Sequence, residues 1–133
     1  MLTILVVDDE KLERKGIRFL LNRRSEEMEI LEAANGKAAC EILQHRTVDI
    51  MLTDIKMPFM DGIELVSVAH KLQPDLEMVI FSGYGEFEYA QNAISLGVQE
   101  YLLKPVKLDA FKNLFEKIID ICQEKEIEKK NRN

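Results

Sequence analysis

Acidic side chains follow two apolar segments of the sequence. Asp8 and Asp9 come directly after Ile4–Val7, and Asp54 ends the stretch that contains Val48–Leu52. If these segments are neighbouring strands of one parallel sheet, their carboxyl ends meet at the same edge and the three carboxylates lie close together. Carboxylates ~4 Å apart repel by roughly 1 kcal/mol in water and about 4 kcal/mol at an effective dielectric constant of 20. Such a cluster requires a cation or raised pKa values.

A hard divalent cation would meet that requirement. Mg²⁺ prefers one or two carboxylates, several waters and a phosphate oxygen. We predict Asp9 and Asp54 as direct ligands, Asp8 as a ligand through water, and the backbone carbonyl of Lys56 as a further ligand. Lys104 follows the last apolar segment and should face the same cluster. One ammonium beside three carboxylates and a metal ion suits a group that gains and loses a phosphoryl unit, because phosphoryl transfer depends mainly on positioning and charge neutralisation.

Short apolar segments of strand length recur along the chain, with helical spacing of apolar residues between them. Most of these segments are continuous rather than alternating, as expected for parallel strands covered by helices on both faces. The pattern predicts an α/β fold with a doubly wound, five-stranded parallel sheet and about five helices. The segments are Ile4–Val7, Glu29–Ala33, Val48–Leu52, Met78–Phe81 and Tyr101–Leu103.

Length and composition limit the function. The chain has 133 residues with 47% hydrophobic and 32% charged residues, which fits one globular domain. We place that domain at residues 1–122, and residues 123–133 are a polar helix end, a solvated tail or the start of a linker. The net charge of −6 argues against direct nucleic-acid binding. Cys40 and Cys122 form no metal-binding spacing, so reduced thiols and a cytoplasmic location are expected. The apolar first residues are too short for a membrane span.

The motifs together resemble the signature of response-regulator receiver domains, over about residues 2–122. The resemblance implies the strand order 2-1-3-4-5 and Mg²⁺ bound by Asp8 and Asp9, with Asp54 as the acceptor of a phosphoryl group from a sensor histidine kinase. It also implies that Lys104 pairs with the phosphate. The motifs are Val7-Asp8-Asp9-Glu10, Asp54-Ile-Lys-Met-Pro58, Met60-Asp61-Gly62, Ser82-Gly83 and Lys104-Pro105.

Further roles follow from the same resemblance. Ser82 and Tyr101 would form a switch, and Gly83, Lys56 and Tyr84 would control how quickly water reaches the phosphorylated aspartate. Structural roles fall to Pro58, Gly62 and Pro105, with a Lys104–Pro105 bond that is usually cis in the family.

The output of the switch is also suggested by similarity. Residues 82–90 and 101–106 are similar to receivers that precede AraC-type helix-turn-helix domains. Phosphorylation would then change the surface formed by the helix near residues 89–97, the strand at 101–103 and the following helix, with weak homodimerisation through it. The chain would be the front part of a transcription regulator whose DNA-binding output domain is missing. A receiver-only protein is the alternative.

Other functions fit the residues less well. A flavodoxin-like cofactor binder needs a loop of free N–H groups after the first strand, where Asp8-Asp9-Glu10 would repel a phosphate. An aspartyl-phosphate hydrolase would have an Asp-x-Asp pair there and a cap over its substrate. A pseudo-receiver that only mediates contacts is disfavoured because the acids, Ser82 and Lys104 are all present. The prediction is a switch that catalyses only its own phosphotransfer and dephosphorylation, not an enzyme with turnover.

Overall fold

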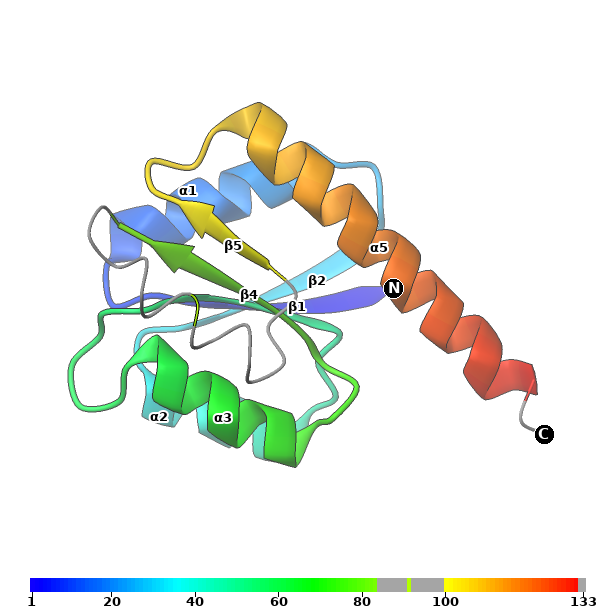
Figure 1. Ribbon diagram of the computed structural model, residues 1–133, viewed down its shortest axis with the longest axis horizontal. Coiled ribbons are helices and arrows are strands. Elements are labelled where there is room, and N and C mark those ends of the chain that lie inside the picture. The colour runs from blue at the N-terminus through cyan, green and yellow to red at the C-terminus, as the bar shows by residue number, and fades with distance from the viewer. Residues whose placement is uncertain (84–90, 92–99, 132–133) are drawn as a thin grey trace.

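A five-stranded parallel sheet forms the centre of the molecule (Figure 1). The computed structural model describes residues 1–83, 91 and 100–131. Every neighbouring pair of strands is parallel, in the order β2-β1-β3-β4-β5, which confirms the predicted fold class and strand order. The strands are β1 (Leu2–Val7), β2 (Met28–Ala33), β3 (Ile50–Asp54), β4 (Glu77–Ser82) and β5 (Glu100–Leu103).

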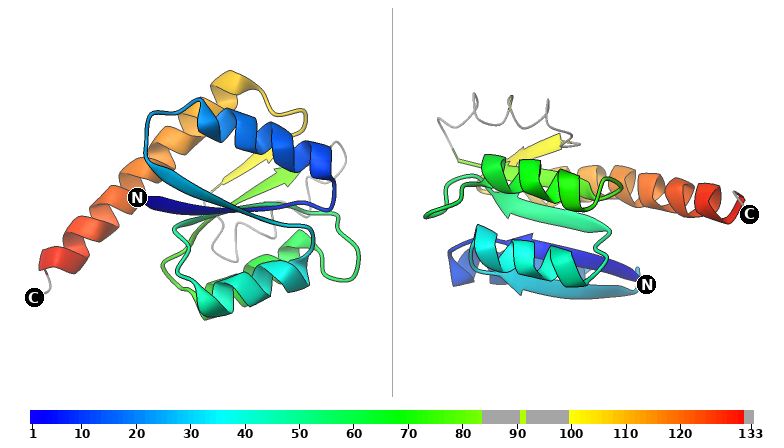
Figure 2. Two further views of the ribbon diagram at one scale, coloured as in Figure 1. Left: turned by 180° about the vertical axis from the view of Figure 1, so that it is seen from behind. Right: turned by 90° about the horizontal axis from the view of Figure 1, so that it is seen from below.

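Helices cover both faces of this sheet (Figures 1 and 2). One face carries α1 and α5, and the other carries α2 and α3. The described part of the chain contains four helices, against the five or so expected, and most of the segment between β4 and β5, where the remaining helix was expected, lies outside the described residues. The four are α1 (Lys11–Asn22), α2 (Gly36–His45), α3 (Gly62–Leu72) and α5 (Leu108–Asn131).

Burial of the central strands on both faces explains their continuous apolar sequence. Every residue of β3 and β4 is buried, and so are the last four residues of β1. Leu5 and Val7 belong to the core cluster that includes residues of α2 and α3, whereas Ile4 and Val6 belong to the cluster that includes residues of α1 and α5. Side chains alternate along a strand, so a strand between two helical layers needs apolar residues at every position.

Helix α5 continues well past the sheet (Figure 1). Its buried residues end at Ile119, and the polar segment from residue 123 to Asn131 remains helical. The domain boundary at residue 122 and the role of this segment as a tail or the start of a linker stay predictions. In the described ranges, no helix is both long and apolar enough to cross a membrane.

Candidate functional site

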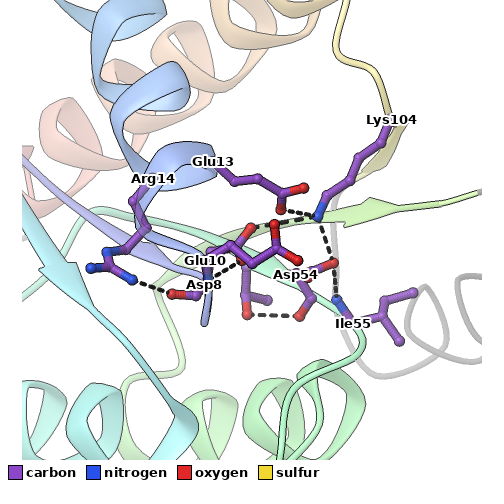
Figure 3. A network of polar contacts seen from close by, with 8 residues as sticks. Asp8, Glu10, Glu13, Arg14, Asp54, Ile55 and Lys104 are labelled. Atoms are coloured by element: carbon purple, nitrogen blue, oxygen red, sulfur yellow. Dashed lines mark hydrogen bonds and ion pairs between the residues drawn. The ribbon is translucent and has the colours of Figure 1, made fainter.

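The carboxyl ends of the strands bring the polar side chains together. Asp8 follows β1, Asp54 ends β3, and Lys104 follows β5. Backbone hydrogen bonds continue past the ends of β1 and β5. The Asp8 amide donates to Ala33 O at 3.2 Å, and the Lys104 amide donates to Ser82 O at 2.8 Å. Figure 3 shows the side chains of Asp8, Asp54 and Lys104 pointing toward one another.

The Lys104 ammonium lies at the centre of this cluster. Its Nζ is 3.1 Å from Asp54 Oδ1, 3.5 Å from Asp8 Oδ2 and 2.5 Å from Glu13 Oε2. Asp8 and Asp54 are buried, and Glu13 is half-buried. Carboxylate oxygens of the three acids lie within 4.8 Å of one another. Lys104 is therefore shared among three acids and cannot neutralise them all.

Sequence reasoning missed Glu13. This residue lies in the first turn of α1, which begins three residues after Asp8. A signal was present, because a helix that starts directly after the acids must send part of its first turn back over the ends of the strands. The side of the helix that does so depends on how α1 packs on the sheet.

The Asp8 carbonyl contributes to this packing, since Arg14 Nη1 of α1 donates to it at 2.7 Å.

Burial and the excess of negative charge shift the pKa values of the three acids. Burial, then a hydrogen bond with Glu13 and the charge of Asp54, raise the pKa of Asp8 to about 7, although the Glu10 amide and Lys104 act in the opposite direction. Burial also raises the pKa of Asp54, against the lowering effect of Lys104. The hydrogen bond with Asp8, more than the neighbouring ammonium of Lys104, lowers the pKa of Glu13. These directions mean that ionisation of Asp8 and Asp54 is less favourable than for exposed carboxylates, and additional positive charge would favour it.

The donor set fits a hard divalent cation. Carboxylate oxygens gathered from two strand ends and a helix match the preference of Mg²⁺ for carboxylate ligands. The cluster differs in membership from the predicted ligand set. Asp9 is exposed and lies outside the group formed by Asp8, Glu13 and Asp54. Lys56 is also exposed. The assignment of Asp9 and of the Lys56 carbonyl as ligands therefore stays a prediction.

The loop after β3 is closely packed under the cluster. A Cβ atom on Gly62 would lie 2.2 Å from the backbone oxygen of Asp54, so a side chain there would displace the backbone at the acid. The Gly62 amide also donates to Ile55 O at 2.7 Å. Between Ile55 and Gly62, the Pro58 carbonyl accepts a hydrogen bond from the Met60 amide at 2.8 Å, and Phe59 has a left-handed backbone with φ of 70°. Gly62 thus fixes the position of Asp54 through contact of the two backbones.

The remaining predicted residues surround the cluster. The Ser82 side chain is fully buried, and its hydroxyl has no hydrogen-bond partner in the part of the chain that the structure describes. Tyr101 is half-buried and packs against the core cluster beneath α2 and α3. Gly83 is half-buried, and Tyr84 lies outside the described residues. The Lys104–Pro105 bond is cis, as the resemblance implied.

Comparison with known proteins agrees with this arrangement. The family model of the response regulator receiver domain matches residues 4–116. This chain belongs to that family. Receiver domains are signalling modules rather than classical enzymes, and they act in phosphorylation-dependent signalling. They bind Mg²⁺ at an acidic pocket, interact with histidine kinases and are often linked to DNA-binding output domains.

The relatives of this receiver include both long and short proteins. It is 36% identical over 131 residues to the transcriptional regulatory protein YesN of Bacillus subtilis, with 98% of the receiver but only 36% of YesN covered. It is 32% identical over 120 residues to the sporulation initiation phosphotransferase F of the same organism, with 89% of the receiver and 94% of the relative covered. The receiver therefore spans about a third of one relative and nearly all of the other.

Solved structures include an AraC-type relative. A two-component transcriptional regulator AraC from Clostridium phytofermentans matches with a TM-score of 0.83 and 35% identity, covering 93% of this receiver and 97% of that chain. The homologues of this receiver thus include receivers of AraC-type transcriptional regulators, as the sequence similarity suggested.

Proposed function

We propose that this receiver is a phosphorylation-gated switch in which Asp54 accepts a phosphoryl group from a sensor histidine kinase. The observation that carries the proposal is the position of Asp54. Its carboxylate is buried at the end of β3, beside the carboxylates of Asp8 and Glu13, and Lys104 lies 3.1 Å away. A nucleophile for phosphoryl transfer needs this combination of a fixed carboxylate and nearby positive charge.

The two oxygens of Asp54 have different surroundings. Oδ1 accepts a hydrogen bond from the Ile55 amide at 2.9 Å and contacts Lys104 Nζ. These contacts hold the carboxylate in one orientation and favour Oδ2 as the attacking oxygen. In the proposed step, Oδ2 forms a bond to phosphorus, the P–N bond of the phosphohistidine breaks, and the histidine nitrogen leaves with the electron pair.

Charge neutralisation makes this transfer possible. Asp8, Asp54, Asp9 and the Lys56 carbonyl are the proposed ligands of Mg²⁺, which supplies neutralisation of the phosphoryl oxygens when it is bound. Lys104 contributes the second positive charge from within the cluster. Dephosphorylation requires water to reach the same carboxyl group, and we assign control of that access to Gly83, Lys56 and Tyr84. The protein would therefore catalyse only its own phosphotransfer and dephosphorylation.

The buried Ser82 hydroxyl supports a switch. An unpartnered buried polar group typically costs about 1–3 kcal/mol, so a new acceptor close to β4 would be favourable. A phosphoryl group adds about −1.5 to −2 charge and three acceptor oxygens. Recruitment of Ser82 would let Tyr101 turn inward and change the surface near β5 and α5, where we expect weak homodimerisation. Moving a population from 1:99 to 99:1 takes about 5.5 kcal/mol, so Ser82, Lys104 and the metal must share the work.

The output follows from the relatives. The receiver covers 36% of YesN, a transcriptional regulatory protein, and α5 leads away from the sheet. We propose a DNA-binding output domain linked after α5 in the full-length protein. The receiver itself, with a net charge of −6, should not bind DNA. The alternative is a receiver-only protein, and its support is that the chain covers 94% of sporulation initiation phosphotransferase F.

Phosphorylation from a small donor tests the proposal. Acetyl phosphate with Mg²⁺ should add one hydroxylamine-sensitive phosphoryl group to the wild-type chain. Asp54→Asn should abolish this labelling, whereas Asp120→Asn, which removes the same charge from an exposed position on α5, should leave it unchanged. Undiminished labelling of Asp54→Asn would contradict the proposal.

A further inference from the structure

The acid nearest to Lys104 is Glu13 rather than Asp54. Lys104 Nζ lies 2.5 Å from Glu13 Oε2, against 3.1 Å from Asp54 Oδ1 and 3.5 Å from Asp8 Oδ2. An ammonium has three donors, and three carboxylates compete for them here. Figure 3 shows Glu13 reaching the ammonium from α1. Glu13 therefore holds the cation that a phosphoryl group on Asp54 would need.

The three acids differ in how firmly they are held. Asp8 is buried and its Oδ1 accepts a hydrogen bond from the Glu10 amide at 2.9 Å. Asp54 is buried and its Oδ1 accepts a hydrogen bond from the Ile55 amide at 2.9 Å. The Glu13 side chain is 36% exposed, and besides Lys104 it shares a hydrogen bond with the Asp8 side chain rather than with a backbone amide. Of the three, Glu13 is the acid that can swing into water when Lys104 takes another partner.

We propose that Glu13 is a positioning residue that holds Lys104 before phosphorylation and releases it when a phosphoryl group reaches Asp54. The inference rests on the proposed function of Asp54 and Lys104. Two consequences follow from it. Glu13 slows phosphorylation, because its contact with Lys104 must break and its negative charge repels the incoming donor. It also weakens the binding of any phosphoryl mimic, because the mimic must replace Glu13 at the ammonium.

Three variants separate the contact from the charge. Glu13→Gln removes the charge and weakens the contact. Glu13→Asp keeps the charge on a shorter side chain that no longer reaches Lys104. Glu41→Gln removes the same charge from an exposed position on α2 and serves as the control. The readouts are the rate of labelling by acetyl phosphate at saturating Mg²⁺, so that metal affinity does not enter, and the equilibrium affinity for beryllofluoride, a phosphoryl mimic.

We expect Glu13→Gln to accelerate labelling about three- to tenfold and to tighten beryllofluoride binding by a similar factor, since it removes a negative charge a few ångströms from the phosphoryl site. Glu13→Asp should show at least half of this effect on a logarithmic scale, and Glu41→Gln should match the wild type. Labelling and binding unchanged in Glu13→Gln would overturn the inference. Wild-type behaviour of Glu13→Asp would also overturn it, because charge alone would then explain the effect.

An independent measurement follows Lys104 itself. In the wild type, the ¹⁵N-detected signal of the Lys104 ammonium should shift when beryllofluoride is added, and the free protein of Glu13→Gln should already show part of that shift. An identical ammonium signal in the free wild type and free Glu13→Gln would contradict the contact. The inference and the proposed function can fail separately. Labelling of the wild type and its loss in Asp54→Asn test the proposed function, whereas the Glu13 variants test only the inference.

Discussion

The two ends of the sheet each combine buried acids with lysines, in different proportions. At the carboxyl end, Asp8, Glu13 and Asp54 share Lys104. At the amino end, the fully buried Glu77, the first residue of β4, forms an ion pair with a lysine of α5.

That lysine is Lys125, which contacts a single carboxylate and one backbone carbonyl, whereas Lys104 contacts three carboxylates. The Lys125 Nζ contacts Glu77 Oε1 and donates to Asp75 O at 2.9 Å. One turn further along α5, Lys129 Nζ lies 3.7 Å from Asp75 Oδ2.

At the amino end Glu77 and Asp75 each have a lysine partner, although Asp49 also lies there, whereas at the carboxyl end three acids share one lysine. The difference indicates that a balanced ion pair holds two elements together, whereas an unbalanced cluster has excess negative charge that a metal ion can neutralise.

The largest effect should appear at Cys122, beside the balanced pair. Burial, together with the charges of Glu77 and Asp49, raises the pKa of this thiol to about 11 from an ordinary value of 9.0. At pH 8 its thiolate fraction is then about a hundredfold lower than that of an ordinary cysteine, so alkylation should slow by that factor. The measurement is iodoacetamide labelling of a Cys40→Ser chain, native and urea-unfolded.

The sign of the pH dependence follows from the raised pKa of Cys122. The folded state favours the neutral thiol, so this contribution to stability is complete below pH 9 and is lost as pH rises toward 11. Equal labelling rates for native and unfolded chains at pH 8 would show that Cys122 is not shielded.

Removal of the balanced lysine should have the next largest effect. Lys125→Met leaves the buried Glu77 without its cation, and loss of one partner from a buried pair costs about 3–5 kcal/mol. Because Lys125 is itself about a third exposed, we expect a loss of about 2 kcal/mol in the free energy of unfolding. Urea denaturation measures it, with Lys130→Met, an exposed neighbour on α5, as the control. A loss no greater than that of the control would remove the distinction between the two ends.

The same distinction predicts the opposite sign at the carboxyl end. Asp8→Asn removes one of three acids that share Lys104, so in the absence of divalent cations it should raise the free energy of unfolding by about 1 kcal/mol at pH 8. Mg²⁺ should stabilise the wild type more than this variant, because the site of the variant has less negative charge to neutralise. Urea denaturation with EDTA and with Mg²⁺ checks both statements. Destabilisation by Asp8→Asn in EDTA would show that the cluster is balanced after all.

The sequence was a better guide to the carboxyl end than to the amino end. Parallel strands place their carboxyl ends at one edge, so Asp8, Asp54 and Lys104 could be brought together from their positions after apolar segments. Glu13 could not be placed, because its direction depends on the packing angle of α1. The order of strands came from the family resemblance and not from the hydrophobic pattern.

The amino end depends on tertiary structure. The apolar pattern begins at Met78 and predicts a strand without Glu77, whereas the backbone pairs Glu77 with Ile50 of β3. Lys125 stood in a polar segment with three open interpretations. Only the continuation of α5 past Ile119 brings this lysine to Glu77, and no local periodicity predicts a contact across 48 residues.

The site of the acyl phosphate tests the central claim most directly. The chain is phosphorylated with acetyl phosphate and Mg²⁺, the acyl phosphate is reduced with borohydride, and the converted residue is located by peptide mass spectrometry. We predict conversion at Asp54 alone, because this carboxylate is fixed by the Ile55 amide and faces Lys104. Conversion at Asp8 or Glu13, or at several acids of the cluster, would contradict the claim that the unbalanced end of the sheet is built around Asp54.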